Sequence, residues 1–178
     1  MNDLATPAAL REQAASLRLH GLVEHWAEVM AQPEQAHWVA QMLAWEAAER
    51  SRRSLERRLR EAHIGRFKPL VDFDWAWPRQ IDRGAVEELM ALAFVKDASN
   101  VVLVGPNGVG KSMCACNIGY QAVLAGYTAL FTTAGQLLGE LAALDSDSGL
   151  RRKLRQYAAP DVLIIDEGLT FNPQRGTD

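Results

Sequence analysis

Hydrophobic and polar residues follow different patterns in the two parts of the chain. Up to about residue 70, apolar residues recur at helical spacing, and the good helix formers Ala, Leu, Glu, Gln and Arg predominate. The pattern predicts three helices, over residues 7–19, over residues around 22–30 after a break at Gly21, and over residues 34–62. We therefore expect an entirely helical N-terminal region, with Pro7 in its first helical turn.

The longest predicted helix carries a stripe of large apolar side chains. Trp38, Met42 and Trp45 recur on one face, and Leu55 and Leu59 continue the stripe toward its end. Side chains of this size at this spacing usually pack in a core. We therefore expect this stripe to pack in the core.

The second part of the chain alternates short apolar runs with helical segments. A linker with alternating aromatic residues, Phe73, Trp75 and Trp77, is expected to pack as an extended strap. Asp82 is placed to cap a helix over residues 83–94. Continuous apolar strands alternating with helices predict an α/β fold with a parallel sheet. The predicted strands are Val101–Val104, Thr128–Thr132 and Val162–Ile165, and the predicted helices cover 111–125, 135–144 and 149–158.

Composition narrows the class of protein only slightly. The chain has 178 residues, 48% of them hydrophobic, and a net charge of −3, so any nucleic-acid surface must be a local patch. The N-terminus lacks the pattern of a signal peptide, and no apolar stretch is long enough to span a membrane, so we expect a cytoplasmic protein. The spacing of Cys114 and Cys116 suits neither a disulfide nor a zinc site, and the four histidines have no ligand partners in the sequence.

The strongest chemical signal is the stretch VVLVGPNGVGKSM. It satisfies the pattern G-x-x-x-x-G-K-[ST] between a predicted strand and a predicted helix, which is the context that phosphate binding requires. Its glycines permit positive φ, its amides can point at a β-phosphate, and Lys111 supplies a positive charge between the β- and γ-phosphates. Ser112 offers a hydroxyl to Mg²⁺. The predicted nucleotide-binding residues are Gly105, Pro106, Asn107, Gly108, Val109, Gly110, Lys111, Ser112 and Met113.

An acidic pair completes the predicted site. Asp166 and Glu167 follow the apolar run 162–165, at the carboxyl end of a predicted strand. Asp166 is a candidate Mg²⁺ ligand, and Glu167 is placed to polarise an attacking water, which makes Lys111 and Glu167 the catalytic candidates. The 55 positions between Lys111 and Asp166 leave room for the units that would bring them together. The pattern predicts an ATP or GTP site.

An arginine-rich stretch ends the longest predicted helix. Between Glu49 and Lys68, eight basic residues accompany three acidic ones. One interpretation is a solvated face with ion pairs four residues apart, and the other is a surface that contacts nucleic-acid phosphates. The candidate DNA contacts are Arg50, Arg53, Arg57, Arg58, Arg60, Arg66 and Lys68, with Arg151, Arg152, Lys153 and Arg155 as weaker ones.

The chain resembles the IstB-like ATP-binding proteins, helper ATPases of insertion-sequence transposition in the AAA+ class, which are similar to DnaC and DnaA. The resemblance rests on LRLHGLVEHW, RRSLERRLREAHIGRFKPLVDFDW, NVVLVGPNGVGKS, AGYTALFTTAGQLLGEL and LRRKLRQYAAPDVLIIDE. It implies a phosphate-loop parallel sheet, Mg·ATP binding, homo-oligomers on duplex DNA and a transposase partner. It also implies a helical DNA- or partner-binding region over residues 1–70, a linker and helix over 71–98, and an ATP-binding domain over 99–178.

The resemblance also carries an expectation about what this chain lacks. In the family, further strands, a polar sensor residue and an arginine finger follow the acidic pair, whereas this chain continues with GLTFNPQRGTD and stops. We expect a C-terminally truncated domain in which the first strand closes against 162–165 or the ATPase part folds poorly. Nucleotide binding would then be weakened and hydrolysis slight. A DnaC-like helicase loader and an inactive fragment of such an ATPase remain the alternatives.

Overall fold

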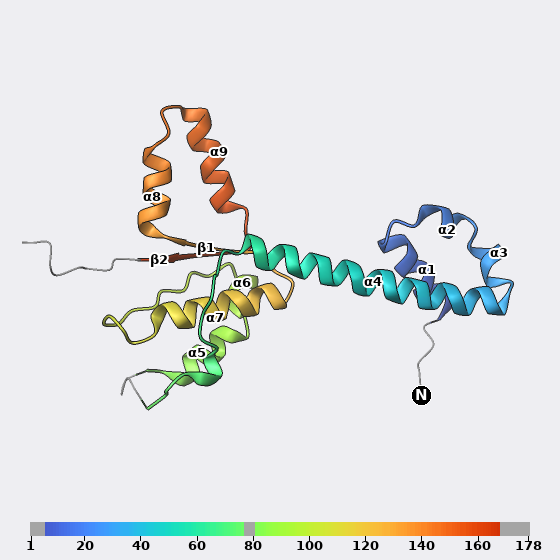
Figure 1. The fold of residues 1–178 in the computed structure, drawn as a ribbon, viewed down its shortest axis with the longest axis horizontal. Coiled ribbons are helices and arrows are strands. Elements are labelled where there is room, and N and C mark those ends of the chain that lie inside the picture. Colours follow the sequence, from blue (N-terminus) through green and yellow to red (C-terminus); the bar gives the residue numbers. More distant parts are fainter. Residues whose placement is uncertain (1–5, 77–80, 168–178) are drawn as a thin grey trace, which may run out of the picture. The chain divides into compact units, whose positions relative to one another are not determined.

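The computed structural model describes residues 6–76 and 81–167, and the chain divides into two compact units. Unit 1 is Met1–Ser54 and unit 2 is Leu55–Asp178. A single helix, α4 (Pro33–Glu61), begins in the first unit and ends in the second, close to the predicted 34–62 (Figure 1). Trp77 of the predicted strap lies outside the described residues.

Unit 1 contains α1 (Pro7–Ser16), α2 (His20–Glu24), α3 (Trp26–Met30) and the first part of α4. The prediction of one helix after a break at Gly21 is wrong, because Gly21 lies inside α2 and the chain breaks at His25. The first helix ends earlier than Gly21. Arg18 adopts a left-handed φ of 57°, and the amides of Arg18 and Leu19 bond back to the last turn of α1 in a Schellman motif.

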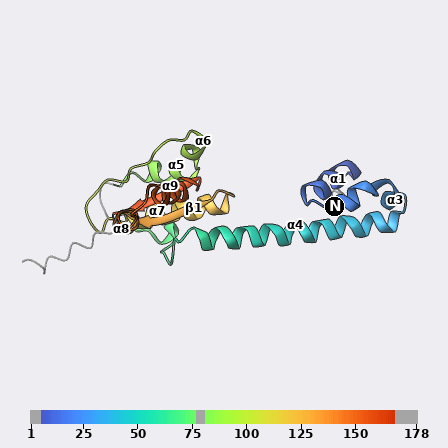
Figure 2. The ribbon, with the colours of Figure 1, turned by 90° about the horizontal axis from the view of Figure 1, so that it is seen from above.

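The short helices of unit 1 lie on one side of α4 (Figure 2), and the buried core of this unit is formed by α1 and α4. Leu10, Ala14 and Leu17 of α1 pack with Val39 and Leu43 of α4. The prediction that the tryptophans of this helix are buried is wrong, since 56% of Trp38 and 59% of Trp45 is exposed. Two apolar stripes lie next to each other on α4, one with Trp38 and Trp45 and one with Val39 and Leu43. Helix α1 packs on the stripe of Val39 and Leu43. A helical period alone cannot tell which of two adjacent stripes a neighbour will cover.

Unit 2 is built on a parallel two-stranded sheet. Strands β1 (Ala129–Thr133) and β2 (Val162–Asp166) pair in register from Ala129 opposite Val162 to Thr133 opposite Asp166, which confirms both predicted strands to within a residue. Asp161 fixes the start of this pair, because its carboxylate accepts bonds of 2.8 Å and 2.7 Å from the amide and hydroxyl of Thr128. These donors favour the ionised form and lower the pKa of Asp161.

The predicted strand Val101–Val104 is wrong for this structure. These residues follow no regular secondary structure, and Val102 and Val104 are 78% and 89% exposed. Residues 99–103 instead line one wall of a cavity of about 670 Å³, and β2 lines another. An extended segment becomes a strand only where its amides and carbonyls find a ladder partner. Within residues 6–76 and 81–167, β2 has β1 as its ladder partner and none on the cavity side.

Helices cover the two sides of the sheet (Figure 1). The predicted helix 83–94 forms as two pieces because Leu92 adopts a left-handed φ of 60° between them, while the predicted Asp82 cap is confirmed by its bond to the amide of Ala85. The three later helices are confirmed to within about two residues. The helices of unit 2 after α4 are η1 (a 3₁₀ turn, Leu70–Asp72), α5 (Arg83–Met90), α6 (Ala93–Lys96), α7 (Lys111–Leu124), α8 (Ala134–Ala142) and α9 (Asp147–Ala158).

The core of unit 2 lies between α7 and the sheet. Ile118, Ala122 and Val123 of α7 pack against Ala129 and Val162, and the predicted Leu55 and Leu59 join from α4. Gly119 lets the helix approach β2 closely, because a β-carbon there would lie 2.5 Å from Cδ1 of Ile164. This packing ties α7 directly to the strand that carries the acidic pair.

A polar cluster joins α8 to α9. The carboxylate of Glu140 accepts a bond of 2.8 Å from the Tyr157 hydroxyl and lies 2.6 Å from the Lys153 ammonium. Together with a bond from Gln136, these contacts favour the ionised form and lower the pKa of Glu140 to about 2.

The Glu140 cluster predicts a specific dependence of stability on acid. A carboxyl whose folded pKa is depressed stabilises the fold above its unfolded pKa, and that contribution is lost as the pH falls toward the folded value. We expect the melting temperature of the parent to fall more steeply between pH 5 and pH 2.5 than that of Glu140→Gln, which lacks the titrating group. Thermal melts followed by circular dichroism measure this. The exposed Glu88→Gln serves as control, and an equal slope in Glu140→Gln and parent would contradict the prediction.

Candidate functional site

The loop of residues 105–112 leads directly into α7. Gly108 and Gly110 have φ of 81° and 99°, and Gly110 is the residue that precedes the first turn of the helix. A β-carbon at Gly108 would meet nothing within 4 Å, so the glycine is needed there for its backbone conformation rather than for space. The first amides of a helix have no partner within it, so this 14-residue helix presents N–H groups and a positive dipole end toward the loop.

Lys111 turns back over the same loop. Its ammonium Nζ donates to the carbonyl oxygens of Gly105 at 2.8 Å and Pro106 at 2.9 Å. The positive charge therefore lies beside the loop backbone and not out in solvent. Ser112 follows on the first turn of α7 with its side chain exposed. The donor set of amides, an ammonium and a hydroxyl suits a phosphate chain with its counter-cation.

The acidic pair shares a cavity with Lys111. Asp166 is the last residue of β2, and Glu167 follows it. Lys111, Asp166 and Glu167 all line the cavity of about 670 Å³ that also contains residues 101–103. The structure thus brings together groups that are far apart in the sequence. A carboxylate, a hydroxyl and a phosphate oxygen are the hard oxygen ligands that Mg²⁺ prefers, so the residues present fit that ion.

The two cysteines are both buried residues of α7, three and five positions after Lys111. Burial raises the pKa of both the Cys114 and Cys116 thiols, and the negative charge of Asp166 raises that of Cys116 further. Both are free thiols, and their protonated state makes them poor nucleophiles and poor metal ligands. In the described part of the chain, no group of three or more His, Cys, Asp or Glu side chains is arranged to hold a metal ion.

The strap of residues 68–75 is held to α7 by Asn117, a residue that sequence reasoning missed. Asn117 is 6% exposed, and its amide makes three bonds. Its Oδ1 accepts from the amide of Leu70 at 2.9 Å, and its Nδ2 donates to the carbonyls of Lys68 at 2.9 Å and Met113 at 2.8 Å. The available signal was a single amide side chain inside the otherwise small and apolar run CACNIG.

The strap brings an aromatic ring onto the phosphate loop. A β-carbon at Gly110 would lie 2.6 Å from Cε2 of Phe73, so the ring packs directly on that glycine. Phe73 is itself positioned by η1, where its amide bonds to the carbonyl of Leu70 at 3.0 Å. Asn117 therefore fixes both the strap and the ring that touches the loop.

Some residues of the arginine-rich stretch make polar contacts within the protein. Arg50 pairs with Glu46 at 2.6 Å and donates to the carbonyl of Leu17, and Arg53 pairs with Glu49. Arg58 reaches the carbonyl of Val123 at 3.4 Å. These contacts support the ion-paired interpretation for part of the stretch. The side chains of the other candidates are exposed, namely Arg57, Arg60, Arg66 and Lys68. On α9, Lys153 pairs with Glu140, while Arg151, Arg152 and Arg155 are exposed.

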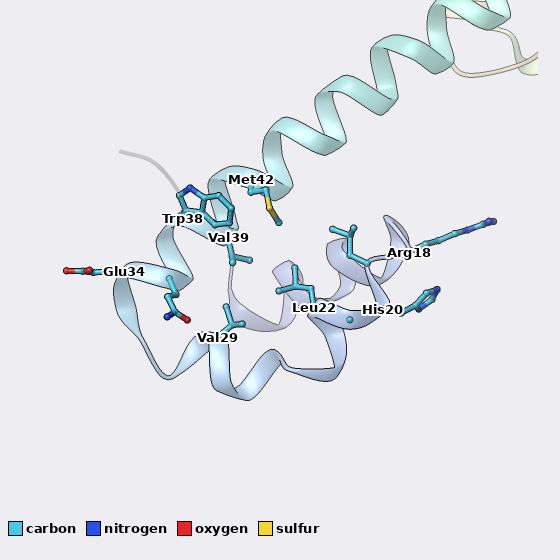
Figure 3. Close-up of a pocket in the computed structure, with 11 residues that line it drawn as sticks. Arg18, His20, Leu22, Val29, Glu34, Trp38, Val39 and Met42 are labelled. Atoms are coloured by element: carbon cyan, nitrogen blue, oxygen red, sulfur yellow. The ribbon is translucent and has the colours of Figure 1, made fainter.

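A second cavity, of about 830 Å³, lies within unit 1 (Figure 3). Leu22 and Val29 face Val39 and Met42 of α4 across it, with Trp38 at its border. Arg18 and His20 stand together at one end, and Glu34 stands at the other. Its walls are mainly apolar, so it lacks the backbone amides and the ammonium that bind a phosphate at the loop.

A loop of this geometry at the start of a helix packed on a parallel sheet defines the phosphate-loop class of α/β proteins. Comparison with known proteins narrows the class. The chain belongs to the IstB-like ATP binding protein family, whose model matches residues 12–175.

Individual relatives are named as putative ATP-binding proteins of insertion sequences. The chain is 30% identical over 164 residues to the insertion sequence IS5376 putative ATP-binding protein of Geobacillus stearothermophilus, covering 89% of this chain and 65% of that protein. It is 41% identical over 118 residues to the insertion sequence IS21 putative ATP-binding protein of Pseudomonas aeruginosa, covering 66% and 44%. The chain thus spans about half to two thirds of the length of these relatives. No helix in residues 6–76 and 81–167 is long and apolar enough to cross a membrane.

The Asn117 contacts predict a large loss of stability on truncation. Asn117→Ala would leave the amide of Leu70 and the carbonyls of Lys68 and Met113 without their partner, and we expect a loss of roughly 2–3 kcal/mol in the free energy of unfolding. Urea unfolding followed by circular dichroism measures this. Leu124→Ala, on the same helix but 46% exposed, is the matched control and should cost much less. An Asn117→Ala protein as stable as Leu124→Ala would show that these bonds do not hold the strap.

Proposed function

We propose that this chain binds Mg·ATP through residues 105–113 and acts as an ATP-dependent helper in the transposition of an insertion sequence. One observation carries the proposal. A glycine loop with two positive-φ residues opens α7, and its Lys111 lines the same cavity as Asp166 and Glu167. Membership of the IstB-like family and relatives named as ATP-binding proteins favour ATP over GTP.

Each residue then has a distinct role. The loop amides hold the β-phosphate, and Lys111 exchanges its bonds to the Gly105 and Pro106 carbonyls for bonds to phosphate oxygens. Ser112 and Asp166 hold Mg²⁺, which supplies charge neutralisation on the phosphates when bound. Glu167, next to the metal ligand, orients the water.

We propose that hydrolysis by this chain alone is slow. Residues 101–104 lead into the loop but form no ladder with β2, so the sheet does not fix the loop relative to Asp166 and Glu167. In-line attack on a phosphate requires sub-ångström positioning, and a misplacement of about 1 Å can cost on the order of 10²-fold in rate. Binding, by contrast, depends on groups within the loop and the start of α7.

Mg·ATP is expected to stabilise the parent and not Lys111→Ala. A ligand that binds only the folded state stabilises it by about 2.7 kcal/mol at 100 times its dissociation constant, which raises the melting temperature by several degrees. Thermal melts over a series of Mg·ATP concentrations measure this. The same melts with Mg·GTP test the choice of base.

The outcomes of this experiment are distinct. A rise in the parent alone supports a nucleotide site built on the loop. Equal rises in both proteins, or none in either, would refute the site and leave the inactive fragment as the better description. Phosphate release from the same samples tests the second part, with Glu167→Gln as control, and turnover near that of a full-length relative would refute slow hydrolysis.

We further propose that the helical region up to residue 70 binds duplex DNA or a partner transposase, with residues 71–98 as a connection and 99–178 as the ATP-binding domain. The relatives' names place them in insertion sequences, which supports a role on DNA. Arg57, Arg60, Arg66 and Lys68 are exposed and follow one another along the end of α4 and the strap. They are the DNA contacts that the structure supports best.

Removing two of these charges should weaken DNA binding and its salt dependence. Each positive charge that no longer neutralises a phosphate lowers the slope of log affinity against log salt by about one, so Arg57→Ala with Arg60→Ala should lower it by about two. Fluorescence anisotropy with labelled duplex at several salt concentrations measures this, with Mg·ATP present. Arg11→Ala, an exposed residue of α1, is the control. No duplex binding by the parent, together with capture of a replicative helicase in place of the transposase, would favour the helicase-loader alternative.

A further inference from the structure

Two aromatic rings lie side by side where the strap meets the phosphate loop. Phe73 packs on Gly110, as the 2.6 Å approach to its β-carbon position shows, and Trp75 packs on Phe73 with ring centroids 4.7 Å apart. The two planes are inclined at 54°, so Phe73 does not cover a whole face of the indole. The guanidinium of Arg83 lies over the Trp75 ring, 5.2 Å from its centroid. The pair thus starts at the loop and extends away from it.

The position of the pair is fixed rather than incidental. Asn117 ties residues 68 and 70 to α7, and η1 then delivers Phe73. The carboxylate of Asp74 accepts a bond of 3.0 Å from the amide of Ala76, which holds the turn that carries Trp75. The loop and the rings are therefore parts of one local structure, joined through the first two turns of α7.

Part of the surface of both rings remains exposed to solvent. Phe73 and Trp75 are each only partly buried, and neither belongs to the hydrophobic core of unit 2. Part of the apolar area of both rings stays in contact with water beside the charged loop, and a stacked ligand would cover it.

We propose that the Phe73–Trp75 pair is the platform on which the base of the bound nucleotide stacks, an inference that rests on the proposed binding of a nucleoside triphosphate. The loop holds the phosphates, and the ribose separates the base from them. Phe73 packs on Gly110, and Trp75 packs on Phe73, so the rings lie where a base separated from the phosphates can reach them. Aromatic rings bind bases by stacking, and a guanidinium on an indole adds a cation–π contact. A two-ring purine covers more of this surface than a pyrimidine, so the site prefers purine nucleotides.

A second aromatic pair in the same unit provides a control. Phe67 and Tyr120 pack with centroids 5.4 Å apart, and Tyr120 is 37% exposed on α7. Tyr120 lies nine residues after Lys111, which is roughly 14 Å along the helix axis. This pair therefore lies farther along the helix from the loop than Phe73, which packs on Gly110.

The test compares Mg·ATP with inorganic triphosphate, which has the phosphates but no base. Binding of both by the full chain is measured by isothermal titration calorimetry for the parent, Trp75→Ala, Trp75→Phe and Tyr120→Leu. We expect Trp75→Ala to bind Mg·ATP about tenfold more weakly while its affinity for triphosphate is unchanged. Trp75→Phe, which keeps a ring, should stay within about twofold of the parent for both ligands. Tyr120→Leu should match the parent.

Each result has a separate meaning. An equal loss of both ligands in Trp75→Ala would show that Trp75 supports the loop and not the base, and unchanged Mg·ATP affinity would show no contact with the base. Either result overturns the platform while leaving the nucleotide site intact. If the parent binds neither ligand, the proposed function fails first. Selective loss of Mg·ATP, rescued by Trp75→Phe, is the result that establishes the platform.

Discussion

The site in unit 2 depends on the three hydrogen bonds of one buried amide. Asn117 holds Lys68 and Leu70 on one side and its own helix at Met113 on the other, so the strap cannot leave α7 without exposing or orphaning these groups. An unpaired buried polar group costs roughly 1–3 kcal/mol, which is large against the stability of a small domain, about 5–15 kcal/mol. The placement of Phe73 on Gly110 follows from this constraint, and so does the position of Trp75 against Phe73.

Features set by local chemistry were predictable from the sequence. The phosphate loop is one, because positive φ at Gly108 and Gly110 is a property of those residues and their immediate neighbours. The cap at Asp82 and the strands of the sheet are others. Asn117 was not predictable, because its partners lie 47 and 49 positions earlier and no local pattern links them. A polar residue inside an apolar helix indicates a buried contact, but it does not say with what.

Two of the wrong predictions, the strand at residues 101–104 and the buried tryptophans of α4, share a physical cause. The run 101–104 has the composition of a buried strand, and α4 has the tryptophans of a buried face. Composition describes what a segment can pack against, whereas burial depends on whether a neighbour is present. Residues 101–103 line a cavity in place of pairing with a strand, and α1 covers Val39 and Leu43 rather than Trp38 and Trp45. Pairing and packing partners are properties of the assembled fold, and the sequence pattern of one segment does not contain them.

Residues 101–104 do not pair with β2, so the loop and the acidic pair must be connected through another element. The connection runs through α7, which starts at Lys111 and packs on β2 through Ile118 against Val162 and through Gly119 against Ile164. A helix packed at a glycine positions its own first turn well, so the phosphate-binding amides and Lys111 are well placed. It constrains residues 105–107 less, because these precede the helix. Nucleotide binding and hydrolysis therefore depend on different parts of the structure. Binding needs the first turn of α7 and the strap that Asn117 holds to it, and hydrolysis needs the loop to be fixed against Asp166 and Glu167 as well.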